Sequence, residues 1–391
     1  MREEYYGKNI ENHIGGGQRN RYIDLVKGIG IVLMVLRQAR APFSDFVLLF
    51  HMAIFFIASG YLIKEENEKN ARNLLVYIWH KIRGLYIPYI AYSVVFICLH
   101  NVFLKLNIYT NSMAFMEETS LESTYKTVFE YYTINDIVLK ICKAAIFKAS
   151  TQVGGAFWFF QVLLIDLIAY AFIDFIFGQI FRNKKRILVI QGVISILLLL
   201  FGYCCDVTGN TLYGLNRECS VYVLIYVGVI LKRYNIMEIL QQNRRILYIA
   251  VASFMILCLG YHRGYIALDG NHIENPAFFL VMSCSGWFLL YGLSFLLEKY
   301  TRIAASIFIY ISKHSVAIIA LHFLAFKIVN VCAVALKGMP QYMIAAFPVL
   351  MTGGLWWLLY VTVGIAVPLC IDFNVRYVNG LMRKRKGKKL K

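Results

Sequence analysis

The chain has 391 residues, of which 59% are hydrophobic and only 16% are charged, and its mean hydropathy is +0.61. This small number of charged side chains could not cover the surface of a soluble protein of this size. The composition therefore indicates a polytopic membrane protein of the all-α class. The net charge of +18 does not indicate nucleic-acid binding, because Lys and Arg lie in short clusters between apolar segments.

The first 21 residues are polar and lack an apolar core followed by a small-residue cleavage site. We therefore expect residues 1–21 to be a cytoplasmic N-terminal segment rather than a removable signal peptide. Residues 22–372 would form the membrane domain, and residues 373–391 a basic cytoplasmic tail. The nine cysteines show no metal-ligand spacing, and most lie in apolar runs, so we predict no metal site and no bound cofactor.

Ten segments are predicted to cross a hydrocarbon core about 30 Å thick. They are residues 22–39, 45–63, 84–104, 155–178, 186–204, 219–232, 246–262, 277–297, 315–335 and 345–371. Cytoplasmic connections retain Lys and Arg, so these residues predict the orientation. One alternating set of connections holds 27 of the 40 Lys and Arg residues, and the other holds 10. We therefore expect both termini in the cytoplasm, about ten transmembrane helices, and connection 105–154 outside.

The first predicted span carries polar side chains on one helical face. Asp24, Lys27 and Gln38 share that face, because eleven residues at about 100° each return Gln38 to within roughly 20° of Lys27. The resulting stripe is about 16 Å long. Polar groups inside a membrane are unfavourable unless they are used or paired, so the stripe is a candidate site. Pairing of Asp24 with Lys27, three residues apart, explains it equally well.

His51 follows in the second span, at a depth comparable with that of Gln38. A lone His within a membrane is often a hydrogen-bonded packing residue. Its proximity to the polar run Arg37-Gln38-Ala39-Arg40 favours a functional role. The same choice arises for His322 in the ninth span.

The third span begins HKIRGLYIPYI and carries Lys81 and Arg83 near its cytoplasmic edge, with a kink predicted at Pro88. Such a cluster is commonly a positive-inside anchor. It is also suited to binding phosphate groups beside a membrane-embedded groove.

Within connection 105–154, apolar side chains recur at helical spacing over residues 134–146, with lysines mostly on the other side. This pattern predicts an amphipathic helix that lies on the outer membrane face or caps the bundle.

The chain resembles the integral-membrane acyltransferases of family 3, and in particular the fucose 4-O-acetylase-like O-acetyltransferases. The resemblance is carried, in order, by RYIDLVKGIGIVLMVL, FHMAIFFIASGYLI, HKIRGLYIPYI, GAFWFFQVLL and ISKHSVAIIALHFLAFKIVN. It implies a multi-pass protein of the cell membrane, expected to be a bacterial cytoplasmic membrane. It also implies transfer of an acyl group, usually acetyl, from cytoplasmic acyl-CoA (acetyl-CoA) to a hydroxyl, commonly on a cell-envelope glycan.

Several site residues follow from the resemblance by position. Lys81 and Arg83 match the basic motif that is expected to meet the phosphates of CoA. Trp158 lies in the family's WF element, where it is expected to contact substrate or support the site. His51 and His322 match its FH and LH elements. The side of the site that binds acyl-CoA is therefore expected to be retained.

Gln38 departs from the family pattern. Eleven positions after its basic residue, here Lys27, the family has the His that is regarded as catalytic. A primary amide cannot accept a proton from a hydroxyl as imidazole can, and general base catalysis typically contributes about 10²–10⁴-fold. Arg37 stands where relatives tend to have a small Gly, and Arg40 adds a second bulky cation. The proton-transfer side of the site is therefore predicted to be remodelled or lost.

Three functions follow from these observations. The first, which we predict, is a membrane O-acyltransferase in which His51 is the base, with the lipid bilayer, acyl-CoA and a glycan acceptor as its partners and no nucleic acid. The second is a catalytically impaired pseudoenzyme that binds acyl-CoA or glycan. The third is a transporter or flippase for an acylated or lipid-linked sugar, although no inverted repeat or pair of broken helices supports it.

Overall fold

The computed structural model describes residues 20–63, 70–119, 121, 125–211, 214–242 and 244–389, with side chains up to residue 378. The predicted N-terminal segment therefore lies outside the described residues, apart from its last two positions. The side chains of most of the predicted basic tail lie outside them as well.

The described chain is predominantly helical, and its two short strands form one hairpin. The elements are α2 (Arg21–Gln38), α3 (Ser44–Leu48), α4 (Ala53–Tyr61), α5 (Ala71–Lys81), η2 (Ile82–Tyr86), α6 (Ile87–Cys98), α7 (His100–Lys105), α8 (Ala114–Glu117), α9 (Ile134–Ala145), η3 (Gln152–Gly154), α10 (Trp158–Ile180), α11 (Lys184–Val207), α12 (Asn216–Arg233), α13 (Ile236–Gln242), α14 (Arg245–Tyr261), β1 (Ile266–Ala267), β2 (His272–Ile273), α15 (Pro276–Tyr300), α16 (Arg302–Lys313), α17 (Ser315–Lys337), η5 (Gln341–Ala345) and α18 (Trp356–Lys389).

Among the described residues, seven helical segments are long and apolar enough to cross a membrane, or eight if the bent pair α13 and α14 forms one span. Each of the ten predicted spans contains a helix. Three of them fall outside the seven. α2 and α12 each carry four charged side chains within 18 residues, and α14 counts only together with α13. The predicted all-α membrane architecture is confirmed.

The third predicted span, 84–104, begins earlier than predicted. α5, the π-helical segment η2 and α6 form one continuous span, Ala71–Cys98. Pro88 lies directly after η2, and a proline lacks an N–H and clashes with the carbonyl four residues before it. The wider π turn accommodates that clash, so the predicted disturbance at Pro88 takes the form of a π segment.

The tenth predicted span, 345–371, begins later than predicted, at Trp356. Gly353 and Gly354 have φ values of 85° and 55°, a backbone conformation that favours glycine and ends the irregular stretch just before the helix.

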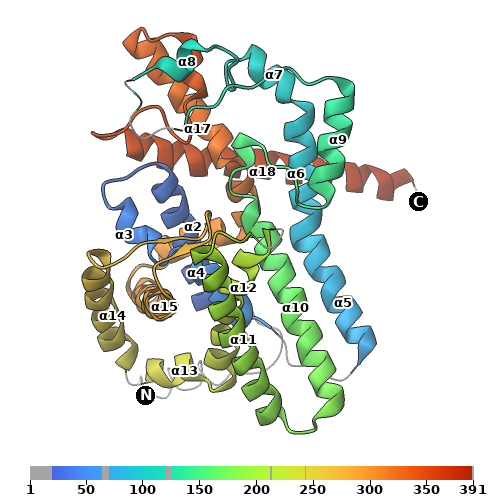
Figure 1. Ribbon diagram of the computed structural model, residues 1–391, viewed down its shortest axis with the longest axis vertical. Coiled ribbons are helices and arrows are strands. Elements are labelled where there is room, and N and C mark those ends of the chain that lie inside the picture. Colours follow the sequence, from blue (N-terminus) through green and yellow to red (C-terminus); the bar gives the residue numbers. More distant parts are fainter. Residues whose placement is uncertain are drawn as a thin grey trace.

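α2 is central to the fold and packs against α3, α4, α15, α16 and α18. Figure 1 shows α5, α10 and α11 side by side, while α17 and α18 cross at the other end of the molecule. More than half of the residues of α2 are buried, including Asp24. The polar stripe of the first predicted span therefore lies inside the protein rather than against lipid.

α4 and α12 cross at very short range through two glycines. A Cβ on Gly60 would lie 2.0 Å from the carbonyl oxygen of Ile225, and a Cβ on Gly228 would lie 2.1 Å from that of Ile57. Small residues let helix backbones approach closely where apolar lipid gives no hydrophobic drive to association. This contact packs the C-terminal half of the second span, α4, closely against α12.

The amphipathic segment within 105–154 corresponds to α9. Thr133 and Asp136 form a capping box at its start, and the hydrogen bonds from the Thr133 backbone and side chain lower the pKa of Asp136. Ile134 is 80% exposed, and most other apolar side chains of α9 are exposed as well. The apolar side of α9 therefore does not cover the bundle, which leaves it available to contact lipid.

Candidate active site

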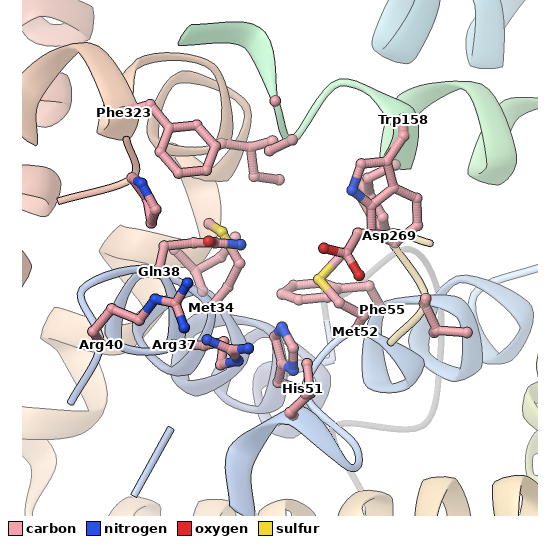
Figure 2. A pocket seen from close by; sticks show the side chains of 18 of the residues that line it. Met34, Arg37, Gln38, Arg40, His51, Met52, Phe55, Trp158, Asp269 and Phe323 are labelled. Atoms are coloured by element: carbon pink, nitrogen blue, oxygen red, sulfur yellow. The ribbon is translucent and has the colours of Figure 1, made fainter. Parts of the chain in front are cut away.

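A cavity of about 120 Å³ lies beside the C-terminal end of α2. Figure 2 shows polar side chains from three separate parts of the chain around it. Its polar lining comprises Arg37, Gln38, Arg40, His51, Tyr125, Trp158 and Asp269, and its apolar lining includes Ile31, Met34, Met52, Phe55, Phe159, Phe323, Phe347 and Pro348. Four of the residues predicted for the site, Arg37, Gln38, His51 and Trp158, thus meet in one cavity.

The cavity extends along one face of α2. Ile31, Met34 and Gln38 all line it, and their spacing of three and four residues places them on the same side of the helix. Lys27 precedes Ile31 by one turn on that side. The cavity therefore runs from Gln38 toward Lys27, in the direction predicted for the polar stripe.

α2 ends in a Schellman motif that carries Arg40 to the cavity. The Arg40 N–H donates to the Arg37 carbonyl at 3.2 Å, and the Ala41 N–H donates to the Leu36 carbonyl at 3.4 Å. Arg40 has φ 56°, the left-handed conformation in which glycine is usual. An L residue in this conformation costs about 1–2 kcal/mol. The strained residue, Arg40, is thus one whose side chain lines the cavity.

His51 lies at a break within the second span, between α3 and α4. The sequence predicted a continuous span over 45–63, and no Pro or Gly marks the break. Irregular backbone at membrane depth occurs where it is buried in protein or lines a cavity, and His51 satisfies both conditions. Its Nδ1 lies 3.0 Å from the Val47 carbonyl oxygen, which can only accept, so Nδ1 carries the hydrogen. Nε2 is then the ring nitrogen with a free electron pair.

His51 lies between groups of opposite charge. Arg37 and Asp269 are both within electrostatic range of its ring. Figure 2 shows Arg37 and Arg40 on one side of the cavity with the Gln38 amide, and Asp269 on the other side near Trp158. The site therefore has a cationic side and an anionic side, with the imidazole between them.

The anionic side is built by a contact that the sequence analysis missed. The Arg217 guanidinium, from the start of α12, lies 4.6 Å from the centroid of the Trp158 ring and donates to the Asp269 backbone carbonyl. Asp269 lies in the turn of the β1–β2 hairpin, where its carboxylate accepts from the Gly270 N–H at 3.0 Å. The segment IALDGNHI has the Asp-Gly turn between short apolar runs that typifies a hairpin, so a signal for this element was present.

A third wall of the cavity is held by a buried cation, Lys327, to which the sequence analysis assigned no role. Its Nζ donates to the carbonyl oxygens of Ile344, Ala345 and Ala346 at 3.2, 2.9 and 2.9 Å. Asn330, one turn later, donates to two of the same carbonyls and accepts from the Leu350 N–H. These bonds fix the segment that carries Phe347 and Pro348 into the cavity wall.

Lys81 and Arg83 do not line this cavity. Lys81 lies over the Tyr77 ring, 4.9 Å from its centroid, and within electrostatic range of Lys27. The Tyr77 hydroxyl is buried without a hydrogen-bond partner among the described residues. Arg83 lies in the π segment η2 and is exposed. Lys81, one of the two predicted phosphate-binding residues, thus lies at the Lys27 end of α2, opposite the end that bears Gln38.

His322 is fully buried behind the cavity wall and does not line it. Its Nδ1 lies 2.9 Å from the Ile318 carbonyl oxygen, and its ring packs against Phe323, which does line the cavity. His322 therefore contacts the cavity wall through Phe323, and its Nε2 is buried without a hydrogen-bond partner among the described residues. Within the described ranges, no group of three His, Cys, Asp or Glu side chains is placed to hold a metal ion.

A family model described as "Acyltransferase domain", of the acyltransferase 3 type, matches residues 20–373. The match spans every helix that contributes to the cavity. Comparisons with curated proteins and with solved structures give no match.

Proposed function

Because the chain belongs to the integral-membrane acyltransferases of family 3, we propose that it transfers an acetyl group from cytoplasmic acetyl-CoA to a hydroxyl of a cell-envelope glycan or glycan precursor. The protein would act in a bacterial cytoplasmic membrane. The observation that carries the proposal is the cavity that joins His51 with Gln38 and Trp158 and runs along α2 toward Lys27.

The donor would bind at the Lys27 end of α2. Lys27 and Lys81 bring two ammonium groups within electrostatic range of each other, an arrangement that a bound phosphate group would stabilise. Arg83 adds a guanidinium that can bind phosphate through two hydrogen bonds. The acyl end of the donor would extend along the Ile31 and Met34 side of the cavity, over about 16 Å from Lys27 to Gln38.

His51 would act as the general base. Its Nδ1–H is held by the Val47 carbonyl, so Nε2 can accept the proton of the acceptor hydroxyl. The hydroxyl oxygen then attacks the thioester carbonyl carbon, a C–O ester bond forms and the C–S bond breaks. The proton passes from His51 to the thiolate of CoA. Asp269, across the cavity, would stabilise the imidazolium between these steps.

Gln38 would have a different role from the family His that it replaces. Its carboxamide can donate a hydrogen bond but cannot take up a proton near neutral pH. We therefore assign it to orienting the acyl carbonyl, with proton transfer left to His51. The glycan would lie against Trp158, whose ring offers a flat apolar face beside the Asp269 carboxylate.

The test is mass spectrometry of envelope glycans from a strain that lacks the gene and carries a plasmid copy. The parent protein should restore O-acetylation, and His51→Ala should lower it by about 10²–10⁴-fold. His322→Ala is the matched control, since His322 is equally buried but lies outside the cavity, and it should reduce activity only as far as it reduces the amount of folded protein. Acetylation that persists after His51→Ala would exclude the role given to His51.

A second candidate function, a pseudoenzyme that binds acyl-CoA or glycan without turnover, is favoured by Gln38. The double substitution Gln38→His and Arg37→Gly restores the family pattern at this position. A pseudoenzyme should gain acetylation with these changes where the parent protein has none. Equal acetylation by the parent and the double variant would reject this candidate.

A further inference from the structure

We propose that the acceptor is an anionic saccharide, bearing a carboxylate or a phosphate, and that Arg37 and Arg40 bind its acidic group. This inference rests on the proposed function for the identity of the acceptor site, but its test measures binding and does not require turnover. It assigns a role to the run Arg37-Gln38-Ala39-Arg40, whose two cations the transfer reaction does not use.

Charge on the cavity wall is unevenly distributed. The charged side chains that line it among the described residues are Arg37, Arg40 and Asp269, and the two guanidinium groups lie together on the side away from Asp269. Neighbouring guanidinium groups repel each other unless an anion lies between or beside them. The planar guanidinium fork matches the geometry of both carboxylate and phosphate.

Arg37 is only weakly compensated by the protein. Its closest carboxylate oxygen belongs to Asp45, at 4.0 Å, and the Asp45 side chain is 66% exposed whereas that of Arg37 is 16% exposed. The Arg37 Nε is buried and has no hydrogen-bond partner among the described residues. A buried donor without an acceptor is unfavourable, so an anion at this position would supply what the protein does not.

Arg40 is placed at the cavity despite backbone strain. Glycine would occupy its left-handed conformation at no steric cost and would end α2 with the same hydrogen bonds. Side-chain chemistry therefore explains Arg40 better than helix termination does. Its position one turn from Arg37 brings both guanidinium groups to one side of the cavity.

The acidic group is not that of the donor. Lys27 and Lys81, which are suited to the phosphates of CoA, lie together at the opposite end of α2, about 16 Å from Gln38 by helical rise. The two arginines instead share the cavity with His51, which would meet the acceptor hydroxyl, and with Trp158. An acceptor with an acidic group, an apolar ring face and a hydroxyl matches this set of side chains.

The experiment measures binding of three simple probes to the purified full-length protein by isothermal titration calorimetry. The probes are glucuronic acid, glucose 6-phosphate and glucose, which share a ring but differ in the acidic group. At least one acid should bind about tenfold or more tightly than glucose, and which acid binds distinguishes a carboxylate from a phosphate. Glucose binding as tightly as both acids, or binding of neither acid, would overturn the proposal.

Two substitutions test the arginines. Arg37→Gln and Arg40→Gly should each weaken binding of the preferred acid by about tenfold or more and leave glucose unaffected. Arg40→Gly should also leave the melting temperature unchanged or raised, since it relieves the left-handed strain. Arg37→Lys, which keeps the charge, should lose less affinity than Arg37→Gln. Arg263→Gln is the matched control, because Arg263 is exposed and lies outside the cavity lining.

Failure of this inference is distinguishable from failure of the proposed function. Arginine-dependent binding of the acid without any acetyl transfer would support the binding site and reject the transferase. If the arginine substitutions leave acid binding intact but lower turnover equally with acidic and neutral acceptors, the arginines stabilise charge in the reaction, and the acidic-acceptor proposal is overturned.

Discussion

Lys327 is 2% exposed, and among the described residues it forms no ion pair with a carboxylate. Its ammonium group is held by three backbone carbonyls that follow one another at the end of η5. Such carbonyls carry the partial negative charge of a helix C-terminus and would be unsatisfied in an apolar surrounding. The cation and the segment end therefore stabilise each other, and this fixes Phe347 and Pro348 at the cavity.

Substitution of Lys327 by Met tests this arrangement. In this variant Asn330 still donates to the carbonyls of Ile344 and Ala346. Only the Ala345 carbonyl, among these three, loses the donor shown here. We expect a loss of about 1–3 kcal/mol in the free energy of unfolding, measured as a lower melting temperature in detergent. Lys337→Met, at the exposed end of the same helix, is the control and should change little. Equal melting temperatures for the two variants would contradict the role given to Lys327.

The candidate site residues singled out from the sequence are those that lie in recognisable motifs. His51 and Trp158 line the same cavity as Gln38, and this cavity extends along the face of α2 that carries the predicted polar stripe. Asp269 and Arg217 were not predicted, because their importance arises from a contact between a hairpin turn and a distant helix start. No local pattern in a single sequence records such a pairing.

At the element scale, the crossing of α4 and α12 offers the sharpest test. Gly60→Val would place side-chain atoms against the Ile225 carbonyl, where even a Cβ would approach to 2.0 Å. We expect the helices to separate and the melting temperature to fall strongly, with a loss of several kcal/mol that exceeds ordinary surface effects. A variant that melts like the parent protein would show that the helices do not cross this closely.

Gly84→Ala is the matched control for helix propensity. Gly84 also lies in a helical segment, but a Cβ there meets nothing within 4 Å. Replacing it should stabilise the helix by about 0.5–1 kcal/mol rather than destabilise it. Opposite signs for the two glycine substitutions separate steric contact from backbone entropy.

Hydropathy predicted the existence of the long helices but not their interruptions. The break at His51 could not be predicted, because residues 49–52 contain neither Pro nor Gly and apolar residues flank them on both sides. α16, over Arg302–Lys313, was missed because twelve residues are too few for a span and the segment was divided between a connection and a polar entry. Both departures depend on tertiary packing, since α16 and α3 each lie against α2.

At the scale of the whole molecule, the distribution of Lys and Arg predicts cytoplasmic termini and an external α9. A green fluorescent protein fused after Lys391 should fluoresce, whereas alkaline phosphatase at the same place should be inactive. In a cysteine-free variant, Asn135→Cys on exposed α9 should react with a membrane-impermeant maleimide in intact cells. Labelling of Asn135→Cys only after the cells are permeabilised would invert the topology.

The unbroken helix between Lys27 and Gln38 fixes both the distance between these two side chains and their relative direction. One residue inserted between them would lengthen α2 by about 1.5 Å and turn every later side chain by about 100°, which would take Gln38 and Arg37 out of the cavity. Only whole turns restore the direction, at about 5.4 Å each. Among relatives of this chain, a change in the length of the acyl donor should therefore appear as an insertion or deletion of whole turns in α2, rather than as a point substitution.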